Sequence, residues 1–108
     1  MEIRDDRKAG RLEAYDGEQL AGVIAYFVLA DTAPGALVAV HTVVEPDHEG
    51  RGIAGELVRT LYGIAAAEQV PVVPLCPYVA AWAARHPELA PEPAPEVVAA
   101  ATTARTLG

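Results

Sequence analysis

The hydrophobic pattern of this chain changes its period at one glycine-rich stretch, HEGRGIAGELV, which runs from His48 to Val58. Before this stretch, apolar residues form long runs that are typical of buried β-strands. After it, Ile53, Leu57 and Leu61 repeat at helical spacing. A strand that leads into an amphipathic helix through a glycine-rich turn favours a mixed α/β fold.

Two strands around a tight turn are predicted in RLEAYDGEQLAGVIAYFVLAD, because Asp16-Gly17 is a strong hairpin signal between extended runs. One face of the second strand is expected to carry Leu20, Ile24, Tyr26 and Val28. The other face is expected to carry Ala21, Val23, Ala25, Phe27 and Leu29. Both faces are apolar, so we expect this strand to be central and covered on both sides.

A turn and a third strand follow. Asp31, Pro34 and Gly35 predict the turn. Residues 37–44 are rich in β-branched side chains and predict another buried strand, which Pro46 ends.

The second half of the chain predicts a helix, a strand and a helix. The first helix is expected to end near Gln69. The segment VPVVPL, residues 70–75, predicts a short strand at a sheet edge, because each of its two prolines lacks a backbone donor. The next helix is expected to begin at Pro77 and to stop at Pro87.

These elements predict an α/β (α+β) fold with a mixed sheet. An antiparallel meander is followed by a right-handed strand-helix-strand crossover and a final helix. We assign residues 1–90 to one small domain. Residues 91–108 form a tail rich in proline and alanine, whose part from Glu96 to Leu107 is either helical or mobile.

Composition excludes several classes of protein. Hydrophobic residues make up 52% of the chain, which is too many for a disordered segment, and no apolar run is long enough to span a bilayer. A net charge of −7 argues against binding to a nucleic-acid backbone. The charged start does not resemble a secretory signal, and the single cysteine, Cys76, fits a reducing compartment. We therefore expect a cytoplasmic protein without nucleic-acid or membrane partners, and we assign no metal site.

The glycine-rich stretch is suited to an anion. A helix start has backbone N–H groups without partners and carries partial positive charge, and glycines remove the side chains that would block a ligand. Gly50 and Gly52 open the turn, Ala54 keeps the first helical turn small, and Arg51 adds a charge. The alternative interpretation is a turn that only reverses the chain.

These residues resemble the GNAT-type N-acetyltransferases. That family carries [QR]-x-x-G-x-[GA] between strand and helix, which falls here on Glu49 to Ala54. Two longer segments, HTVVEPDHEGRGIAGELV and PVVPLCPYVAAWAARHPE, resemble the small YjdJ-type branch. The resemblance extends from Leu12 to Leu89 and is sharpest over His41 to Glu88.

The resemblance implies that acetyl-coenzyme A (acetyl-CoA) binds at the turn and along the preceding strand. The residues implied to bind it are Val43, Val44, Glu45, Glu49, Gly50, Arg51, Gly52, Ile53, Ala54 and Gly55. The first motif position is Glu49 instead of Gln or Arg. A carboxylate there repels a pyrophosphate unless it points into solvent, and Arg51 is expected to compensate for it.

Three side chains are predicted to act in catalysis. Cys76 is expected at a helix cap, where the helix dipole favours a thiolate that accepts the acyl group, and the alternative is a buried core cysteine. His41 is either a general base or a buried histidine bound to a carbonyl. Tyr78 matches a family tyrosine that protonates the departing thiolate, and its alternative is core packing.

Four further residues receive structural interpretations. His48 is either a solvated turn residue or a neighbour of the phosphates, and Thr42 is expected on the face opposite His41. Trp82 is expected in the core, and His86 is expected to cap helix carbonyls.

The predicted function is a small acyl-CoA N-acyltransferase that transfers acetyl to a primary amine. An acyl-CoA-binding module with little or no catalysis is the alternative. A third hypothesis is an acidic scaffold with a vestigial site. A homodimer is one way to cover the second sheet face, and the tail helix is the other.

Overall fold

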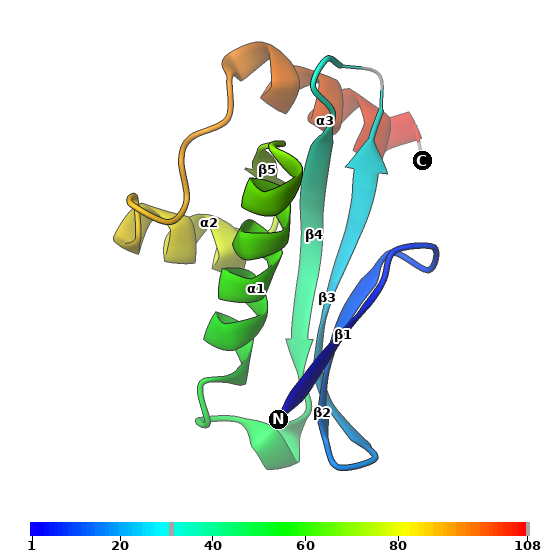
Figure 1. Ribbon diagram of the computed structural model, residues 1–108, viewed down its shortest axis with the longest axis vertical. Coiled ribbons are helices and arrows are strands. Elements are labelled where there is room, and N and C mark those ends of the chain that lie inside the picture. The colour runs from blue at the N-terminus through cyan, green and yellow to red at the C-terminus, as the bar shows by residue number, and fades with distance from the viewer. Residues whose placement is uncertain (31, 108) are drawn as a thin grey trace.

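The computed structural model describes residues 1–30 and 32–107, so Asp31 of the predicted turn and Gly108 of the tail lie outside the described residues. The described residues form a sheet of five strands in the order β1-β2-β3-β4-β5 (Figure 1). The strands are β1 (Glu2–Asp6), β2 (Arg11–Asp16), β3 (Gln19–Leu29), β4 (Ala36–Val44) and β5 (Val72–Pro74). The helices are η1 (Pro46–His48), α1 (Ile53–Glu68), α2 (Pro77–Arg85) and α3 (Pro95–Leu107).

The sheet confirms the predicted fold class. Strands β1 to β4 form an antiparallel meander, and β5 pairs parallel to β4 after the α1 crossover. The hairpin at Asp16-Gly17 is present, with Gly17 at a φ of 64° in the loop. Strand β5 lies at the sheet edge, as its prolines predicted.

Strand β1 was not predicted from the sequence. Its five residues, EIRDD, contain a single apolar side chain, Ile3, which packs against the main core. The strand pairs only with β2 and the rest of it is exposed. A charged edge strand of this kind resists pairing with other chains, but it lacks the alternation that identifies strands from sequence.

Two irregularities in pairing change which residues share a face. Ala21 is an extra residue of β3 opposite β2, and Val40 is an extra residue of β4 opposite β3. Ala21 therefore lies in the core under α1 together with Ile24, and the prediction that placed Ala21 on the other face is wrong. Leu20 pairs with Tyr15, so it does not share the face of Ile24 either.

Helices cover both faces of the sheet, but unequally. Helices α1 and α2 pack on one face over the larger core, which includes Ile24, Leu57 and Trp82. Helix α3 covers one end of the other face, where Ala101 is fully buried against a smaller core that contains Leu29 (Figure 1). The tail is thus helical, and Val28, with 45% of its surface exposed, departs from the expected full cover of β3.

The ends of α1 and α2 agree with the sequence signals. Helix α1 follows Gly52 at a φ of 76° and ends at Glu68 before Gln69 at a φ of 59°. Helix α2 begins with Pro77 in its first turn. At its end, Nδ1 of His86 lies 2.9 Å from the carbonyl oxygen of Trp82, so the predicted capping role is confirmed.

A glycine of β3 brings α1 close to the sheet. A methyl group at Gly22 would lie 3.1 Å from Cγ2 of Ile53 and 3.3 Å from Cδ1 of Leu57. This close approach fixes the first turn of α1 against the central strand, and with it the position of the glycine-rich turn.

Candidate functional site

Strands β4 and β5 pair over only part of the length of β4. The parallel pairs run from Leu37 with Val72 to Ala39 with Pro74, and the backbone N–H of Cys76 donates to Ala39 at 2.9 Å. Among the described residues, β4 has no β5 partner from Val40 to Val44 (Figure 1). Beyond Ala39 the two chains separate, so one edge of β4 is left with free backbone groups.

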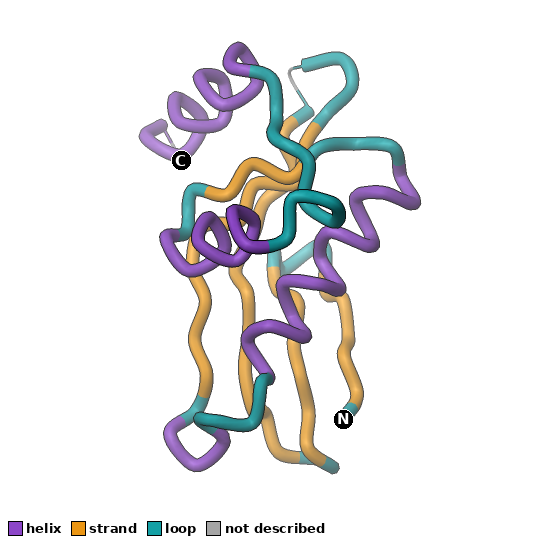
Figure 2. Tube along the Cα trace, turned by 90° about the vertical axis from the view of Figure 1, so that its left-hand side faces the viewer, coloured by secondary structure: helices purple, strands orange, loops and turns teal. Residues whose placement is uncertain are grey.

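The glycine-rich turn lies at the end of this open edge. Figure 2 shows the loop that leads from η1, at the foot of the sheet, to the start of α1. A cavity of about 210 Å³ opens there. Its lining comes from β4, η1, the turn, the start of α1 and α2, namely Val44, His48, Glu49, Gly50, Gly52, Ile53, Ala54 and Tyr78.

The start of α1 presents backbone donors. Within the described part of the chain, no side chain caps Gly52, so the first N–H groups of α1 remain available to a ligand. Gly50 and Gly52 have positive φ values of 80° and 76°, and a methyl group on either would meet no atom within 4 Å. The turn therefore has both the backbone conformation and the open space that an anion requires.

Asp16, from the β2–β3 hairpin, holds two residues of this region. Its Oδ2 accepts a hydrogen bond from Nη1 of Arg51 at 3.2 Å and lies 3.4 Å from Nε2 of His48. The Arg51 guanidinium, and less strongly His48, lower the pKa of the Asp16 carboxyl. The hairpin and the turn are thus joined by one carboxylate, which sequence reasoning did not identify because it lies more than 30 residues away.

His48 is not a solvated turn residue. Only 4% of its surface is exposed, and its Nδ1 is buried without a hydrogen-bond partner among residues 1–30 and 32–107. It lines the cavity at the turn, so the interpretation as a neighbour of an anion site is the one compatible with its position.

The two charged residues of the motif have different surroundings. Glu49 lines the cavity and is exposed. Arg51 pairs with Asp16 and is absent from the cavity lining, so it does not offset the Glu49 charge there.

Tyr78 closes the cavity from α2. It is 39% exposed, so the alternative of core packing is wrong. A methyl group at Gly55 would lie 3.9 Å from the Tyr78 hydroxyl, which places that hydroxyl beside the first turn of α1.

Cys76 caps α2 but is buried, with 4% of its surface exposed. Its Sγ lies 3.4 Å from Oγ1 of Thr42, and it packs within the larger core. This environment fits the core-cysteine alternative, because a thiol that reacts with a substrate needs access.

His41 is exposed and is not brought together with Cys76 and Tyr78. It pairs with Ala25, which lies on the α3 side of the sheet, whereas Thr42 pairs with Ile24 on the α1 side. The alternative of a buried histidine is therefore wrong, and the expected opposition of His41 and Thr42 is confirmed.

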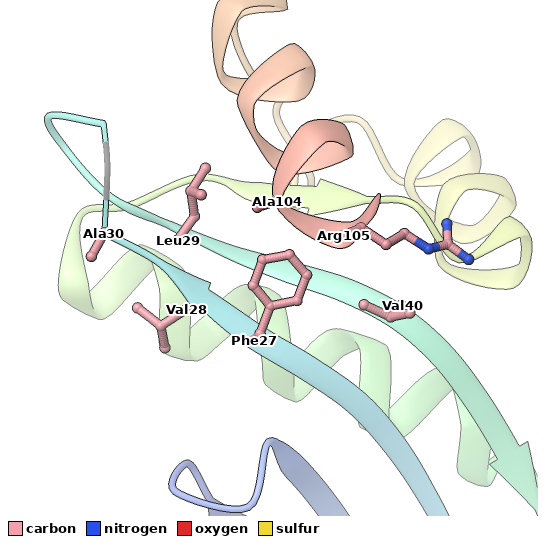
Figure 3. A pocket seen from close by; sticks show the side chains of 7 residues that line it. All are labelled: Phe27, Val28, Leu29, Ala30, Val40, Ala104 and Arg105. Atoms are coloured by element: carbon pink, nitrogen blue, oxygen red, sulfur yellow. The ribbon is translucent and has the colours of Figure 1, made fainter. Parts of the chain in front are cut away.

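A second cavity, of about 530 Å³, lies between the sheet and the end of α3 (Figure 3). Its lining is apolar except for Arg105, and Phe27 and Leu29 point toward α3 from β3 (Figure 3). It is larger than the cavity at the turn, but none of the predicted site residues lines it. The larger cavity is therefore not the one that the predicted site residues line.

The described residues lack two kinds of feature. No helix among them is long and apolar enough to cross a membrane. No group of three or more His, Cys, Asp or Glu side chains among them is arranged to hold a metal ion.

Comparisons with known proteins agree with this fold. Among solved structures, the chain is similar to a ribosomal-protein-alanine N-acetyltransferase from Brucella melitensis biovar Abortus 2308, with 24% identity and a TM-score of 0.58. The match covers 77% of this chain and 63% of that protein, so the chain spans less than two thirds of its length. This likeness supports the GNAT-like fold.

No curated protein matches the chain. The sequence model of the GCN5-related N-acetyltransferases matches residues 11–91, which include β2 to β4, the glycine-rich turn and α2. The chain therefore belongs to the GCN5-related N-acetyltransferase (GNAT) family.

Proposed function

We propose that this protein is an acyl-CoA-dependent N-acyltransferase that moves an acetyl group from acetyl-CoA to a primary amine. One observation carries the proposal: β4 extends past its last β5 partner, and its open edge ends at a cavity lined by the glycine-rich turn. An extended ligand arm has free backbone groups along this edge, and an anion has helix N–H groups at its end.

The residues at this end fit the ligand. The pyrophosphate would be held by backbone N–H groups between Gly50 and Gly55, where a methyl group on Gly50 or Gly52 would meet empty space. The pantetheine arm would follow Val43, Val44 and Glu45. Acetyl-CoA supplies an acyl group that is already activated as a thioester.

Tyr78 is the proposed acid of the reaction. Direct transfer forms a bond between the amine nitrogen and the acyl carbon, and it breaks the bond from that carbon to sulfur. The sulfur takes a proton from the hydroxyl of Tyr78, a residue that lines the cavity and is 39% exposed. The amine gives its proton to a base, for which His41 on the opposite sheet face and water are the two candidates.

The covalent route through Cys76 is the competing mechanism. In that route the Cys76 sulfur takes the acyl group and passes it to the amine. The burial of Cys76 beneath Thr42 favours direct transfer, because an acyl carrier must reach two substrates in turn.

An acyl-CoA-binding module with little catalysis is the second candidate function. The position of Glu49 on the cavity favours it, since a carboxylate there weakens the binding of an anion. The segment PLCPY supports placement in the small YjdJ-like branch of the family. We further propose a cytoplasmic location, residues 1–90 as the acyl-CoA-binding domain, residues 91–108 as a tail, and a homodimer as the assembly.

Thermal unfolding with and without acetyl-CoA is the first experiment. If the folded state binds the ligand, the midpoint rises with ligand concentration. Transfer is then measured with a panel of primary amines: a polyamine, an aminoglycoside, a lysine peptide and a peptide with N-terminal alanine. Acetylation of one of these supports the enzyme, and binding without any transfer supports the module. An unchanged midpoint at a large excess of acetyl-CoA contradicts both.

Intact-mass measurement separates the two routes. Direct transfer predicts no acetylated protein, full activity for Cys76→Ser and a large loss for Tyr78→Phe. An acetyl adduct that disappears in Cys76→Ser would instead establish the covalent route.

A further inference from the structure

The imidazole of His48 has an unexplained polar atom. The ring is 4% exposed, and its Nδ1 is buried without a hydrogen-bond partner among the described residues. Buried polar groups nearly always have partners, because each one left without a partner destabilises the fold. An exception of this kind at a cavity requires an explanation, and a partner that arrives with a ligand supplies one.

The other ring nitrogen, Nε2, already has a neighbour, the carboxylate of Asp16. Nε2 lies 3.4 Å from Oδ2 of Asp16, and the backbone N–H of His48 donates to the Glu45 carbonyl at 2.9 Å. These contacts hold the ring at the end of η1, where His48 lines the cavity. With Nε2–H directed at Asp16, the Nδ1 atom is left for the ligand.

The charges of the cavity-lining residues explain why a donor at Nδ1 of His48 would matter to an anionic ligand. Of the cavity-lining residues, His48 is the single one that can become positive, and Glu49 is negative. The Arg51 guanidinium donates to Asp16 and does not line the cavity. Tyr78 from α2 is the remaining ionisable group on the cavity, while β4 and α1 contribute only apolar side chains and backbone. Asp47 adds a further carboxylate on η1 itself, where it is exposed.

We propose that His48, held by Asp16, becomes an imidazolium when acyl-CoA binds and donates its Nδ1–H to a phosphate oxygen of the ligand. This inference rests on the proposed function. It gives the chain a cation in place of the Gln or Arg that the motif carries at the position of Glu49. The proton balance follows: the Nδ1–H donor exists only in the protonated ring, so a ring that is neutral before binding takes one proton from solvent, and affinity falls as the pH rises.

Calorimetry with free coenzyme A tests this without turnover. Titrations in buffers of different ionisation enthalpy should show proton uptake on binding, and the dissociation constant should rise between pH 6 and pH 8. Pantetheine, which lacks the phosphates, is the matched ligand and should bind without that dependence on pH.

Two substitutions of His48 then test the contributions of its two ring nitrogens separately. His48→Gln places its amide where it can reach Asp16 but removes the polar atom at Nδ1, so coenzyme A should bind about 10- to 100-fold more weakly. His48→Phe removes both contacts and should weaken binding similarly, yet the ligand-free protein should melt at the same temperature or higher, because an unpartnered buried atom is gone. His86→Gln, which changes a histidine outside the cavity, is the control and should bind as the wild type does.

The outcomes are distinguishable. Weaker binding with the pH dependence lost, in a protein that still folds, supports the role of His48. Unchanged affinity and unchanged proton uptake in His48→Gln would overturn it while leaving the proposed function intact. A wild-type protein that binds no coenzyme A at any pH would overturn both.

Discussion

The two halves of β4 are built differently although they belong to one strand. From Ala36 to Ala39 every residue is buried and the strand is paired on both sides. From Val40 to Val44 no residue is fully buried, and β3 is its single strand partner among the described residues. The first half belongs to what we call the closed end of the molecule, and the second half to the open end.

This difference places the well-packed part of the sheet at the closed end and the candidate ligand site at the open end. At the closed end, α1 and α3 cover opposite faces, and every residue of β4 from Ala36 to Ala39 is buried. At the open end, glycines with positive φ, a carboxylate on the cavity and a buried imidazole without a partner all reduce stability locally. The extra residue Val40 marks the transition, because it shifts the register where β4 leaves β5.

The largest expected effect is at the closed end. Leu37→Ala removes a side chain that is 1% exposed and should lower the free energy of unfolding by about 2–5 kcal/mol. Val43→Ala, in the same strand but 39% exposed, should change it by about 0.5 kcal/mol. Urea unfolding of both variants checks this, and equal losses would mean that the two halves of β4 are equally part of the core.

The second largest effect on stability is expected at alkaline pH. Burial raises the pKa of Tyr62 to about 12. The unfolded chain releases this proton near pH 10, and the folded protein keeps it until about pH 12. Stability contributed by the neutral hydroxyl is therefore complete below pH 10 and decreases as the pH rises, by an amount on the order of 1–3 kcal/mol.

Tyr62→Phe should reduce this alkaline loss while keeping the stacking on Trp82, where the ring centroids are 5.8 Å apart. Tyr26 should supply the rest, since burial and then the contact with Asp5 raise its pKa to about 12. Melting temperatures from pH 8 to pH 11 measure the difference. A Tyr62→Phe curve parallel to that of the wild type would show that the hydroxyl titrates as it does in solvent.

A third test concerns the open end. Gly52→Ala imposes a left-handed conformation on alanine and should cost about 1 kcal/mol in unfolding free energy. Gly17→Ala imposes the same strain in the β2–β3 loop, where a methyl group also meets open space. Only the first methyl group lies at the candidate ligand site, so only Gly52→Ala should weaken coenzyme A binding, by at least about tenfold. Equal effects of both changes on binding would place the ligand elsewhere.

Sequence reasoning identified the parts of this molecule that depend on neighbouring residues. The hairpin at Asp16-Gly17, the limits of α1 and the position of β5 all follow from short patterns, and the structure confirms them. Strand β1 was missed because its single apolar residue, Ile3, gives no periodic signal. The extra residue Ala21 was missed because it depends on pairing with a different strand.

In the candidate site, too, features that depend on residues distant in the sequence were not predicted. The glycine-rich turn was visible in the sequence, but the partners of its charges were not. Arg51 was expected to compensate for Glu49, yet a carboxylate from the distant hairpin, Asp16, pairs with it. The buried His48 lies 3.4 Å from that same carboxylate, a contact that no local pattern indicates.

The smallest expected effect tests that contact directly. Arg51, with a smaller contribution from His48, lowers the pKa of Asp16, so the stability from this carboxylate is present above its ordinary value, near 4, and disappears as the pH falls through the lowered value. Asp16→Asn should therefore melt slightly below the wild type at pH 7, and the gap should close as the pH falls below that lowered value.

Glu2→Gln is the matched control for Asp16→Asn, because Arg4 similarly lowers the pKa of Glu2. That pair joins residues two positions apart in one exposed strand, whereas the Asp16–Arg51 pair joins segments 35 positions apart. An exposed pair contributes little by itself, but one that closes a long loop also restrains the turn. Asp16→Asn should consequently increase hydrogen exchange at the amides of the turn at pH 7, and Glu2→Gln should not. Equal exchange in both variants would mean that the turn holds its shape without the hairpin.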